Sequence, residues 1–248
     1  MVNAYGMETC MSLEGVWKAA KAQLDSDGFT APMPLARPDV LETVIREFHD
    51  SIVYNRNPHV TSEAVRTLVF DPGIRQALST LCGDGFMLWR SAMFVKAPGG
   101  KEIGWHHDKH FSDGDAPVEL NLDDRHYSVF IAITDVGAED GCLEMLPGSH
   151  RETLGIERDV RPFHKRPASD HILPALPADN ADDIIASPVP AGHFIIFHSA
   201  LLHRSRENLS DTTRLGLAFR LAPAQRDIPL DLAQPGDVTP YSEAELEA

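Results

Sequence analysis

The residues best suited to chemistry lie in two segments far apart in the chain, Trp-His-His-Asp at 105–108 and His-Arg-Ser at 203–205, with Arg214 following the second. Two imidazoles and one carboxylate that face one metal and leave other positions open are the ligand set of non-haem Fe(II) oxygenases. The pattern therefore predicts metal-dependent oxidation chemistry. It says much less about the substrate.

Local geometry supports the first segment as part of a metal site. In an extended strand alternate side chains point the same way, so His106 and Asp108 are expected on one face with Gly104, while Ile103 and Trp105 face the other side. His106 and Asp108 can then bind one ion together. Taken alone, a His-x-Asp triplet is weak support, because such triplets arise by chance.

A third ligand is expected where the apolar run 193–203 ends. His198 and His203 compete for this role, and spacing alone does not choose between them. His203 is linked to the arginine signal that follows and His198 is not, which favours His203 as the ligand and His198 as a hydrogen-bonded strand residue.

The segment 214–220 alternates clearly between apolar residues and a second face that carries Arg214, Gly216, Ala218 and Arg220. If that face points into a barrel, its guanidinium groups need carboxylates, because a buried unpaired charge is costly. A dicarboxylate co-substrate would provide one. The alternative is two exposed arginines on an outer sheet face.

Length and composition bound the class of protein. With 248 residues, 43% hydrophobic and 24% charged, the chain fits one large globular domain. Its formal charge of −15 would repel nucleic acid and anionic membranes. No signal peptide or transmembrane run is recognised, so we expect a cytoplasmic protein. Three scattered cysteines, Cys10, Cys82 and Cys142, predict free thiols and a reducing compartment.

The elements that must position these residues are helical first and extended later. Apolar spacing predicts helices at 13–24, 38–51 and 61–82, the last broken near 71–73 by proline and glycine. Short strands are expected at 86–96, 103–108, 127–134, 142–146, 193–197 and 214–221. We therefore predict a single domain, 1–248, that is mainly β with N-terminal helices: a helical support region at 1–84, a β sandwich or jelly-roll core at 85–222, and a C-terminal tail at 223–248.

Two longer segments lack periodicity, the acidic stretch 109–125 and the proline-rich stretch 151–190. Long loops in compact domains are often functional. The second is either a lid over the site or a plain surface excursion.

Four motifs together resemble one known family: residues 23–29 ending Asp-Gly-Phe, Trp-His-x-Asp at 105–108, the run ending Leu-Pro-Gly-Ser-His at 140–150, and His-x-Ser-x-x-Asn-x-Ser-x-x-x-Arg at 203–214. In this order they are similar to the phytanoyl-CoA dioxygenase family of Fe(II)- and 2-oxoglutarate-dependent oxygenases. The resemblance implies a double-stranded β-helix, a cupin-like jelly roll, in which iron, 2-oxoglutarate and O2 react.

The same resemblance implies roles for individual residues. His106, Asp108 and His203 would bind Fe(II), and Arg214, helped by the Ser205 hydroxyl, would bind the distal carboxylate of 2-oxoglutarate. Residues 147–150, Asn208 and Ser210 would shape turns beside the site. Related halogenases have Gly or Ala in place of the aspartate, so Asp108 implies hydroxylation or another oxidation, with release of succinate and CO2.

The substrate is expected to be a small-molecule metabolite, and the oligomeric state stays open. Residues on or near the strands that should border the site are candidate substrate contacts: Arg90, Met93, Trp105, Lys109 and His110. Two other functions remain. A hydrolase could use 106–110 as a zinc cluster, although this leaves Arg214 unexplained. A retired β sandwich could serve as a binding module.

Overall fold

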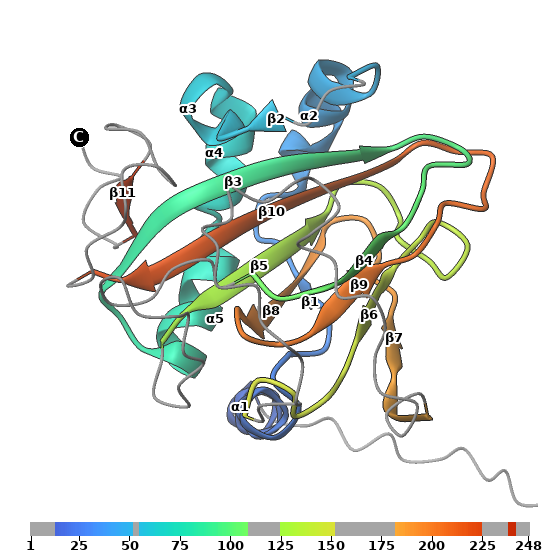
Figure 1. Ribbon diagram of the computed structural model, residues 1–248. Coiled ribbons are helices and arrows are strands. Elements are labelled where there is room, and N and C mark those ends of the chain that lie inside the picture. The colour runs from blue at the N-terminus through green and yellow to red at the C-terminus, as the bar shows by residue number, and fades with distance from the viewer. Residues whose placement is uncertain (1–12, 52–54, 109–124, 152–181, 225–237, 242–248) are drawn as a thin grey trace, which may run out of the picture.

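Two antiparallel sheets pack face to face, and helices cover the outer side of the larger sheet (Figure 1). The computed structural model describes residues 13–51, 55–108, 125–151, 182–224 and 238–241. The helices are α1 (Leu13–Asp27), η1 (Pro38–Val40), α2 (Leu41–Phe48), α3 (Pro58–Thr61), α4 (Glu63–Val69) and α5 (Pro72–Cys82). The strands are β1 (Met33–Pro34), β2 (Asn55–Arg56), β3 (Phe86–Lys96), β4 (Ile103–His106), β5 (Tyr127–Ala132), β6 (Leu143–Met145), β7 (Ile185–Ser187), β8 (His193–His198), β9 (His203–Ser205), β10 (Arg214–Pro223) and β11 (Thr239–Tyr241).

The strand order confirms the predicted double-stranded β-helix. The large sheet runs β1-β8-β5-β10-β3-β11, with β2 also paired to β3, and the small sheet runs β4-β9-β6-β7. Strands from both halves of the core therefore alternate within each sheet, and the chain passes repeatedly from one sheet to the other (Figure 1). This interleaving is the jelly-roll arrangement expected from many short strands.

Side-chain alternation along β10 separates two cores. Leu215, Leu217 and Phe219 are fully buried in the cluster that joins the large sheet to the helices. Ala218 belongs to a second cluster between the two sheets. The inner face of β10 therefore carries small residues between its two arginines, which leaves space for a cavity inside the barrel.

Most predicted elements are present, and their ends differ by a few residues. The first helix extends to Asp27, and the break in the third falls between α4 and α5. The three-residue strands β7 and β9 were not predicted, because periodicity needs a longer run. Most of the possible lid, most of the tail and Cys10 lie outside the described residues; Cys82 and Cys142 are free thiols. No helix among the described residues combines the length and apolarity that a membrane span requires.

The start of α5 depends on a single buried carboxylate. Asp71 caps the helix by accepting from the backbone N–H of Gly73 at 2.8 Å and of Ile74 at 3.3 Å. It also accepts from the N–H groups of Ala36 at 3.0 Å and Arg37 at 2.7 Å, which joins the helix to the preceding loop. Because an aspartate N-cap satisfies donors that the helix cannot, its loss leaves several of them without an acceptor.

Asp71→Ala is therefore expected to lower the free energy of unfolding by about 3 kcal/mol, the upper end of a cap plus a lost buried acceptor. Urea unfolding followed by circular dichroism measures this. Asp84→Ala, at the other end of the same helix, is the control. Equal unfolding midpoints for the two variants would contradict the capping role.

Candidate active site

Three candidate metal ligands meet where β4 and β9 pair. His106 ends β4, Asp108 follows two residues later, and His203 begins β9. The antiparallel register places the two histidines opposite each other, with ring centroids 4.3 Å apart. One ligand atom from each of the three lies within 4.8 Å of the other two, and no other such cluster occurs in the described part of the chain. Sequence segments separated by almost a hundred residues thus form one possible metal site.

Both histidines use Nδ1 for a backbone hydrogen bond, which leaves Nε2 as the atom available to a metal. The Nδ1 of His106 lies 2.8 Å from the carbonyl oxygen of Gly104, and the Nδ1 of His203 lies 3.0 Å from that of Leu201. A carbonyl oxygen only accepts, so each Nδ1 carries the proton and each Nε2 keeps its lone pair. Burial lowers the pKa of His106 to about 3 and also lowers the pKa of His203. Both rings are therefore neutral near pH 7, the form that binds a metal.

The expected strict alternation along β4 is wrong at one point. Ile103 pairs with Ser205 and His106 with His203, so three steps along β4 match two along β9. This register shift is a β-bulge, which redirects side chains. Ile103 therefore lines the same cavity as His106 and Asp108 instead of facing away from it.

The structure separates the two histidines that competed for the third ligand position. His203 belongs to the cluster, whereas His198 ends β8 and accepts a hydrogen bond at Nδ1 from the backbone N–H of Ala200 at 3.1 Å. The ring of His198 packs edge-on against Tyr127, with centroids 5.6 Å apart. His198 thus has the structural role that was favoured for it.

Asp108 is held by partners that the sequence did not connect to it. Its Oδ1 accepts from the Nη2 of Arg220 at 2.5 Å, and its Oδ2 accepts from the hydroxyl of Ser128 at 2.8 Å. The Ser128 hydroxyl lies 3.1 Å from that of Ser199, whose carbonyl accepts from the backbone N–H of Asp108. The one available signal was that Arg220 shares the inner face of β10 with Arg214.

Arg214 carries a buried positive charge at another part of the same cavity. It is 2% exposed, and its guanidinium carbon lies 5.0 Å from the centre of the Phe130 ring. Its Nε and Nη2 have no hydrogen-bond partner among the described residues. Burial lowers the pKa of Arg214 to about 10, which leaves it charged at neutral pH. A buried guanidinium with open donors matches a carboxylate ligand, which it can bind through two parallel hydrogen bonds.

Lys96, on a strand expected to border the site, makes hydrogen bonds at the end of the cavity that holds Arg214. Lys96 lies opposite Arg214 in the register of β3 and β10. Its ammonium donates to the hydroxyl of Ser205 at 2.7 Å and also contacts the carbonyl oxygen of Arg206. Burial, followed by the charge of Arg214, lowers the pKa of Lys96 to about 8. The Ser205 hydroxyl donates its single proton to the carbonyl of Gly141 at 3.2 Å, so it would have to turn in order to donate to a carboxylate ligand.

One cavity joins these groups. Its polar walls are His106, Asp108, His203, Ser205 and Arg214. Its apolar walls are Phe94, Ile103, Phe130, Leu143, Phe197 and Ala218. A mostly apolar chamber with a few convergent polar groups is typical of a small-molecule site. The arrangement suits a small dicarboxylate that reaches from a metal to the guanidinium.

Gly216 leaves room for one wall of this cavity. A Cβ added there would lie 2.5 Å from the Cε2 of Phe130, whose ring packs against Arg214. Gly216→Ala is therefore expected to displace the ring and to destabilise the protein by about 1–3 kcal/mol. Thermal unfolding measures this effect. Gly137→Ala, whose added Cβ meets only a side-chain end, is the control, and matching values for the two variants would contradict this role.

Residues 147–150 were expected to shape a turn beside the site, and their hydrogen bonds join α1 to the residue that precedes β9. The backbone N–H of Gly148 donates to the carbonyl of Asp27 at 3.0 Å. The hydroxyl of Ser149 accepts from the backbone N–H of Leu202 at 2.9 Å. The turn therefore connects the end of α1 to Leu202, the residue just before the candidate metal ligand His203.

Asn208 organises the loop between β9 and β10. It is fully buried, and its side-chain amide donates to the carbonyls of Lys96 and Thr212, each at 2.8 Å. Its Oδ1 accepts from the hydroxyl of Ser210 at 2.8 Å. These bonds fix the path from His203 to Arg214 and agree with the turn role expected of Asn208 and Ser210.

The candidate substrate residues occupy different surroundings. Arg90 is buried on the inner face of β3, opposite Arg220. Met93 is fully buried in the cluster between sheet and helices. Trp105 packs outside the small sheet, with the guanidinium of Arg204 5.0 Å from its ring. Arg90 is thus the one of these three that shares the inner face with a partner of Asp108. Outside the described residues lie Lys109 and His110.

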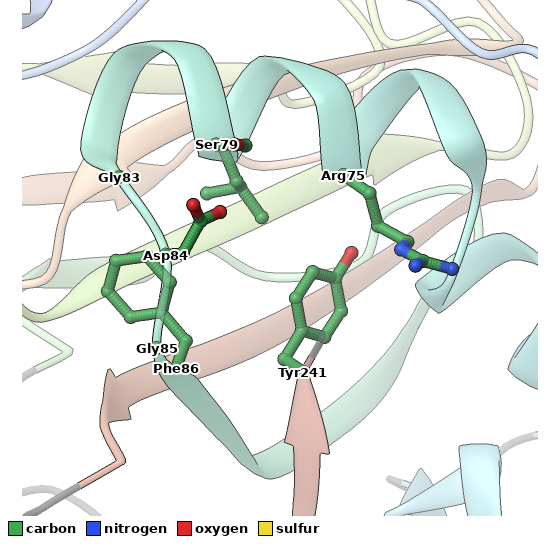
Figure 2. Close-up of a pocket in the computed structure, with 8 residues that line it drawn as sticks. Arg75, Ser79, Gly83, Asp84, Gly85, Phe86 and Tyr241 are labelled. Carbon is green, nitrogen blue, oxygen red and sulfur yellow. The ribbon is translucent and has the colours of Figure 1, made fainter. Parts of the chain in front are cut away.

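A second cleft lies between α5, the start of β3 and β11 (Figure 2). Tyr241 lies on β11 and faces α5 (Figure 2). Its hydroxyl donates to the carbonyl of Val69, the last residue of α4, at 2.7 Å. Burial raises the pKa of Tyr241 well above its usual range. Because this hydroxyl is buried and bonded to the backbone, it serves the fold, and the cleft is not the candidate active site.

Comparison with known proteins agrees with this site. Residues 24–216 match the family described as Phytanoyl-CoA dioxygenase (PhyH). "Phytanoyl-CoA dioxygenase domain-containing protein 1" of Rattus norvegicus is 27% identical over 188 residues, 74% of this chain and 62% of that protein. A "probable alpha-ketoglutarate-dependent hypophosphite dioxygenase" of Stutzerimonas stutzeri is 25% identical, over 68% of this chain and 56% of its own length. The chain thus spans less than two thirds of these relatives.

Solved structures share the fold at lower identity. The alpha-ketoglutarate-dependent carbocyclase SnoK from nogalamycin biosynthesis has a TM-score of 0.64 at 23% identity, covering 87% of this chain and 85% of its own. The epimerase SnoN, solved with Fe3+, alpha-ketoglutarate and nogalamycin RO, has a TM-score of 0.63 at 19% identity, covering 86% of this chain and 90% of its own. These similarities establish the architecture.

Proposed function

Because the chain belongs to the phytanoyl-CoA dioxygenase family of Fe(II)- and 2-oxoglutarate-dependent oxygenases, we propose that it is a dioxygenase that oxidises a small-molecule metabolite, with hydroxylation of an unactivated C–H bond as the favoured reaction. His106, Asp108 and His203 would bind Fe(II). Arg214, with Ser205, would bind the distal carboxylate of 2-oxoglutarate.

One observation carries the proposal: a buried guanidinium with open donors lies on the wall of the cavity that holds the three candidate ligands. Burial of a guanidinium without acceptors for its N–H groups destabilises a protein, and a bound carboxylate offsets this cost by accepting from those groups. A zinc hydrolase has no need of it, and zinc binding within 106–110 leaves Arg214 without a role. The donor set also fits iron, since two neutral imidazoles and one carboxylate form the facial triad of non-haem iron enzymes.

The bound iron, with 2-oxoglutarate and O2, would supply the oxidising chemistry and release succinate and CO2. The protein's residues would position the metal ligands and shield the cavity from water. Hydrogen bonds from Nδ1 to the carbonyls of Gly104 and Leu201 fix both imidazole rings. The walls formed by Phe94, Phe130 and Phe197 exclude water from the space between ligands and guanidinium. Binding and orientation are thus the protein's contribution.

The substrate class is assigned only as far as a small molecule. The names of the two relatives give no common substrate, since one is named for the domain it contains and the other for hypophosphite. Asp108 occupies the carboxylate position, which favours hydroxylation or another oxidation over halogenation. A reducing compartment such as the cytoplasm is the proposed location, because Cys82 and Cys142 are free thiols and iron must stay ferrous.

Anaerobic titration tests the proposal. Fe(II) and 2-oxoglutarate, added to metal-free protein, are expected to give the weak visible charge-transfer band of the chelate, and admission of air should then release succinate. 2-Oxovalerate, which lacks the distal carboxylate, is the matched ligand and should bind far more weakly. Metal binding without the band would favour the hydrolase or a retired binding module.

A further inference from the structure

The candidate iron ligand Asp108 forms a buried ion pair with Arg220. The Nη2 of Arg220 lies 2.5 Å from Oδ1 of Asp108, and the two side chains are 8% and 2% exposed. Solvent therefore screens this pair very little. The guanidinium sits beside the proposed metal position and has no assigned role in holding 2-oxoglutarate.

The position of Arg220 in the large sheet directs its side chain toward the Asp108 carboxylate. On the inner face of the large sheet, Arg220 lies opposite Ser128 of β5 and opposite Arg90 of β3. The pairing of β10 with β3 shifts register immediately after Arg220. Irregularities of this kind redirect side chains and are frequent beside active sites. The contact between Arg220 and Asp108 is thus built into the backbone.

Both oxygens of Asp108 are engaged, and by different strands. Oδ1 accepts from Arg220 on β10, and Oδ2 accepts from Ser128 on β5 at 2.8 Å. A carboxylate oxygen has two lone pairs, so each can accept one hydrogen bond and keep a second site. Rotation of the carboxylate about its terminal torsion would break both contacts at once. The pair of donors therefore fixes the plane of the carboxylate.

We propose that Arg220 is a positioning residue that restrains Asp108 as a one-oxygen metal ligand and so keeps a coordination position open. The inference rests on the proposed function. With three protein ligands and a chelating 2-oxo acid, a bound iron would have one coordination position left for O2. A carboxylate that turned to bind through both oxygens would occupy that last position.

The ion pair also opposes metal binding. Arg220 stabilises the carboxylate in the metal-free protein and repels a divalent cation, so the two compete for Asp108. Removal of the guanidinium should therefore strengthen Fe(II) binding while it closes the open position. A residue with only a structural role would weaken both properties or neither.

Nitric oxide separates these effects, because it binds ferrous iron at an open position and gives an electron paramagnetic resonance signal. Wild type, Arg220→Met and Arg220→Gln are loaded anaerobically with Fe(II) and 2-oxoglutarate and titrated with nitric oxide. Arg37→Met, which removes an arginine from the exposed pair with Asp39, is the control. Relative to wild type, both Arg220 variants should bind nitric oxide about tenfold more weakly and Fe(II) at least as tightly.

Nitric oxide binding within threefold of wild type in a folded Arg220 variant would overturn the inference. If Arg220→Met does not fold, Arg220→Gln carries the test on the same criterion. The proposed function fails in a different way, since wild type would then show no band with Fe(II) and 2-oxoglutarate. Wild-type protein that gives the band, beside a variant with unchanged nitric oxide affinity, refutes only the role of Arg220.

Discussion

Asp108→Ala is expected to lower both Fe(II) affinity and succinate formation by at least about 100-fold. Loss of a group that orients a metal ligand costs about 10–100-fold in metal affinity or in activity, and a direct ligand contributes to both. The carboxylate is the only anionic member of the candidate cluster. Its removal therefore takes away the charge that compensates for transfer of a divalent ion into a buried site.

The same substitution has a second, separable effect on stability. It removes the carboxylate that pairs with Arg220 inside the barrel. Breaking a buried ion pair from one side costs about 3–5 kcal/mol. We therefore expect a lower unfolding temperature for the metal-free variant, so binding must be measured below that temperature and after circular dichroism shows a folded protein.

Asp39→Ala is the control for loss of an acidic residue, because Asp39 is exposed and pairs with Arg37 at the surface. It should bind Fe(II) like wild type. Isothermal titration with Fe(II) under nitrogen, followed by a succinate assay in air, gives both quantities. Full turnover by Asp108→Ala without added ligands would refute the metal assignment.

Local sequence pattern was enough to predict which neighbouring residues of the site lie close together or share a face of a strand. The His-x-Asp triplet places His106 and Asp108 close together in any extended segment, and they are close in the structure. Alternation along 214–220 predicted that Arg214 and Arg220 share a face, and both are buried on the inner face of β10. These features need only the two-residue period of a strand.

Contacts that depend on sheet register could not be predicted in this way. Ser128 reaches Asp108 because β5 pairs with β10, and Lys96 faces Arg214 because β3 pairs with the other edge of β10. Nothing in the local sequence of either strand encodes these partners. The bulge between Ile103 and His106 has the same origin, since it arises from pairing with β9. Long-range pairing therefore sets the electrostatic environment of the site, whereas local pattern sets its ligands.

Arg214→Met is expected to raise the dissociation constant of 2-oxoglutarate by about 100-fold or more, in line with the 2–5 kcal/mol lost when one partner of a buried, hydrogen-bonded charge pair is removed. The reason is positional: Nε and Nη2 of Arg214 are buried without partners among the described residues, and Arg214 lines the cavity of the candidate ligands. Anaerobic titration, followed by the visible band, measures the constant.

The metal-free protein should respond in the opposite direction. Replacement of a buried charge by an apolar side chain of similar volume is neutral or stabilising, by roughly 1–3 kcal/mol, because the cost of burying unpaired donors disappears. Arg214→Met should therefore unfold at an equal or higher temperature than wild type. A variant that loses both stability and binding would instead indicate that Arg214 supports the fold.

The ligand itself provides the sharpest control. 2-Oxovalerate can still chelate iron through its 2-oxo acid end but has no carboxylate to offer the guanidinium, so wild type and Arg214→Met should bind it equally. The preference for 2-oxoglutarate over 2-oxovalerate should therefore collapse in the variant, while Fe(II) affinity stays unchanged. Lys96 gives an internal check, because part of the lowering of its pKa comes from Arg214; its pKa should rise in the variant. If the preference survives, the distal carboxylate binds elsewhere in the cavity, and the assignment of Arg214 fails although the metal assignment stands.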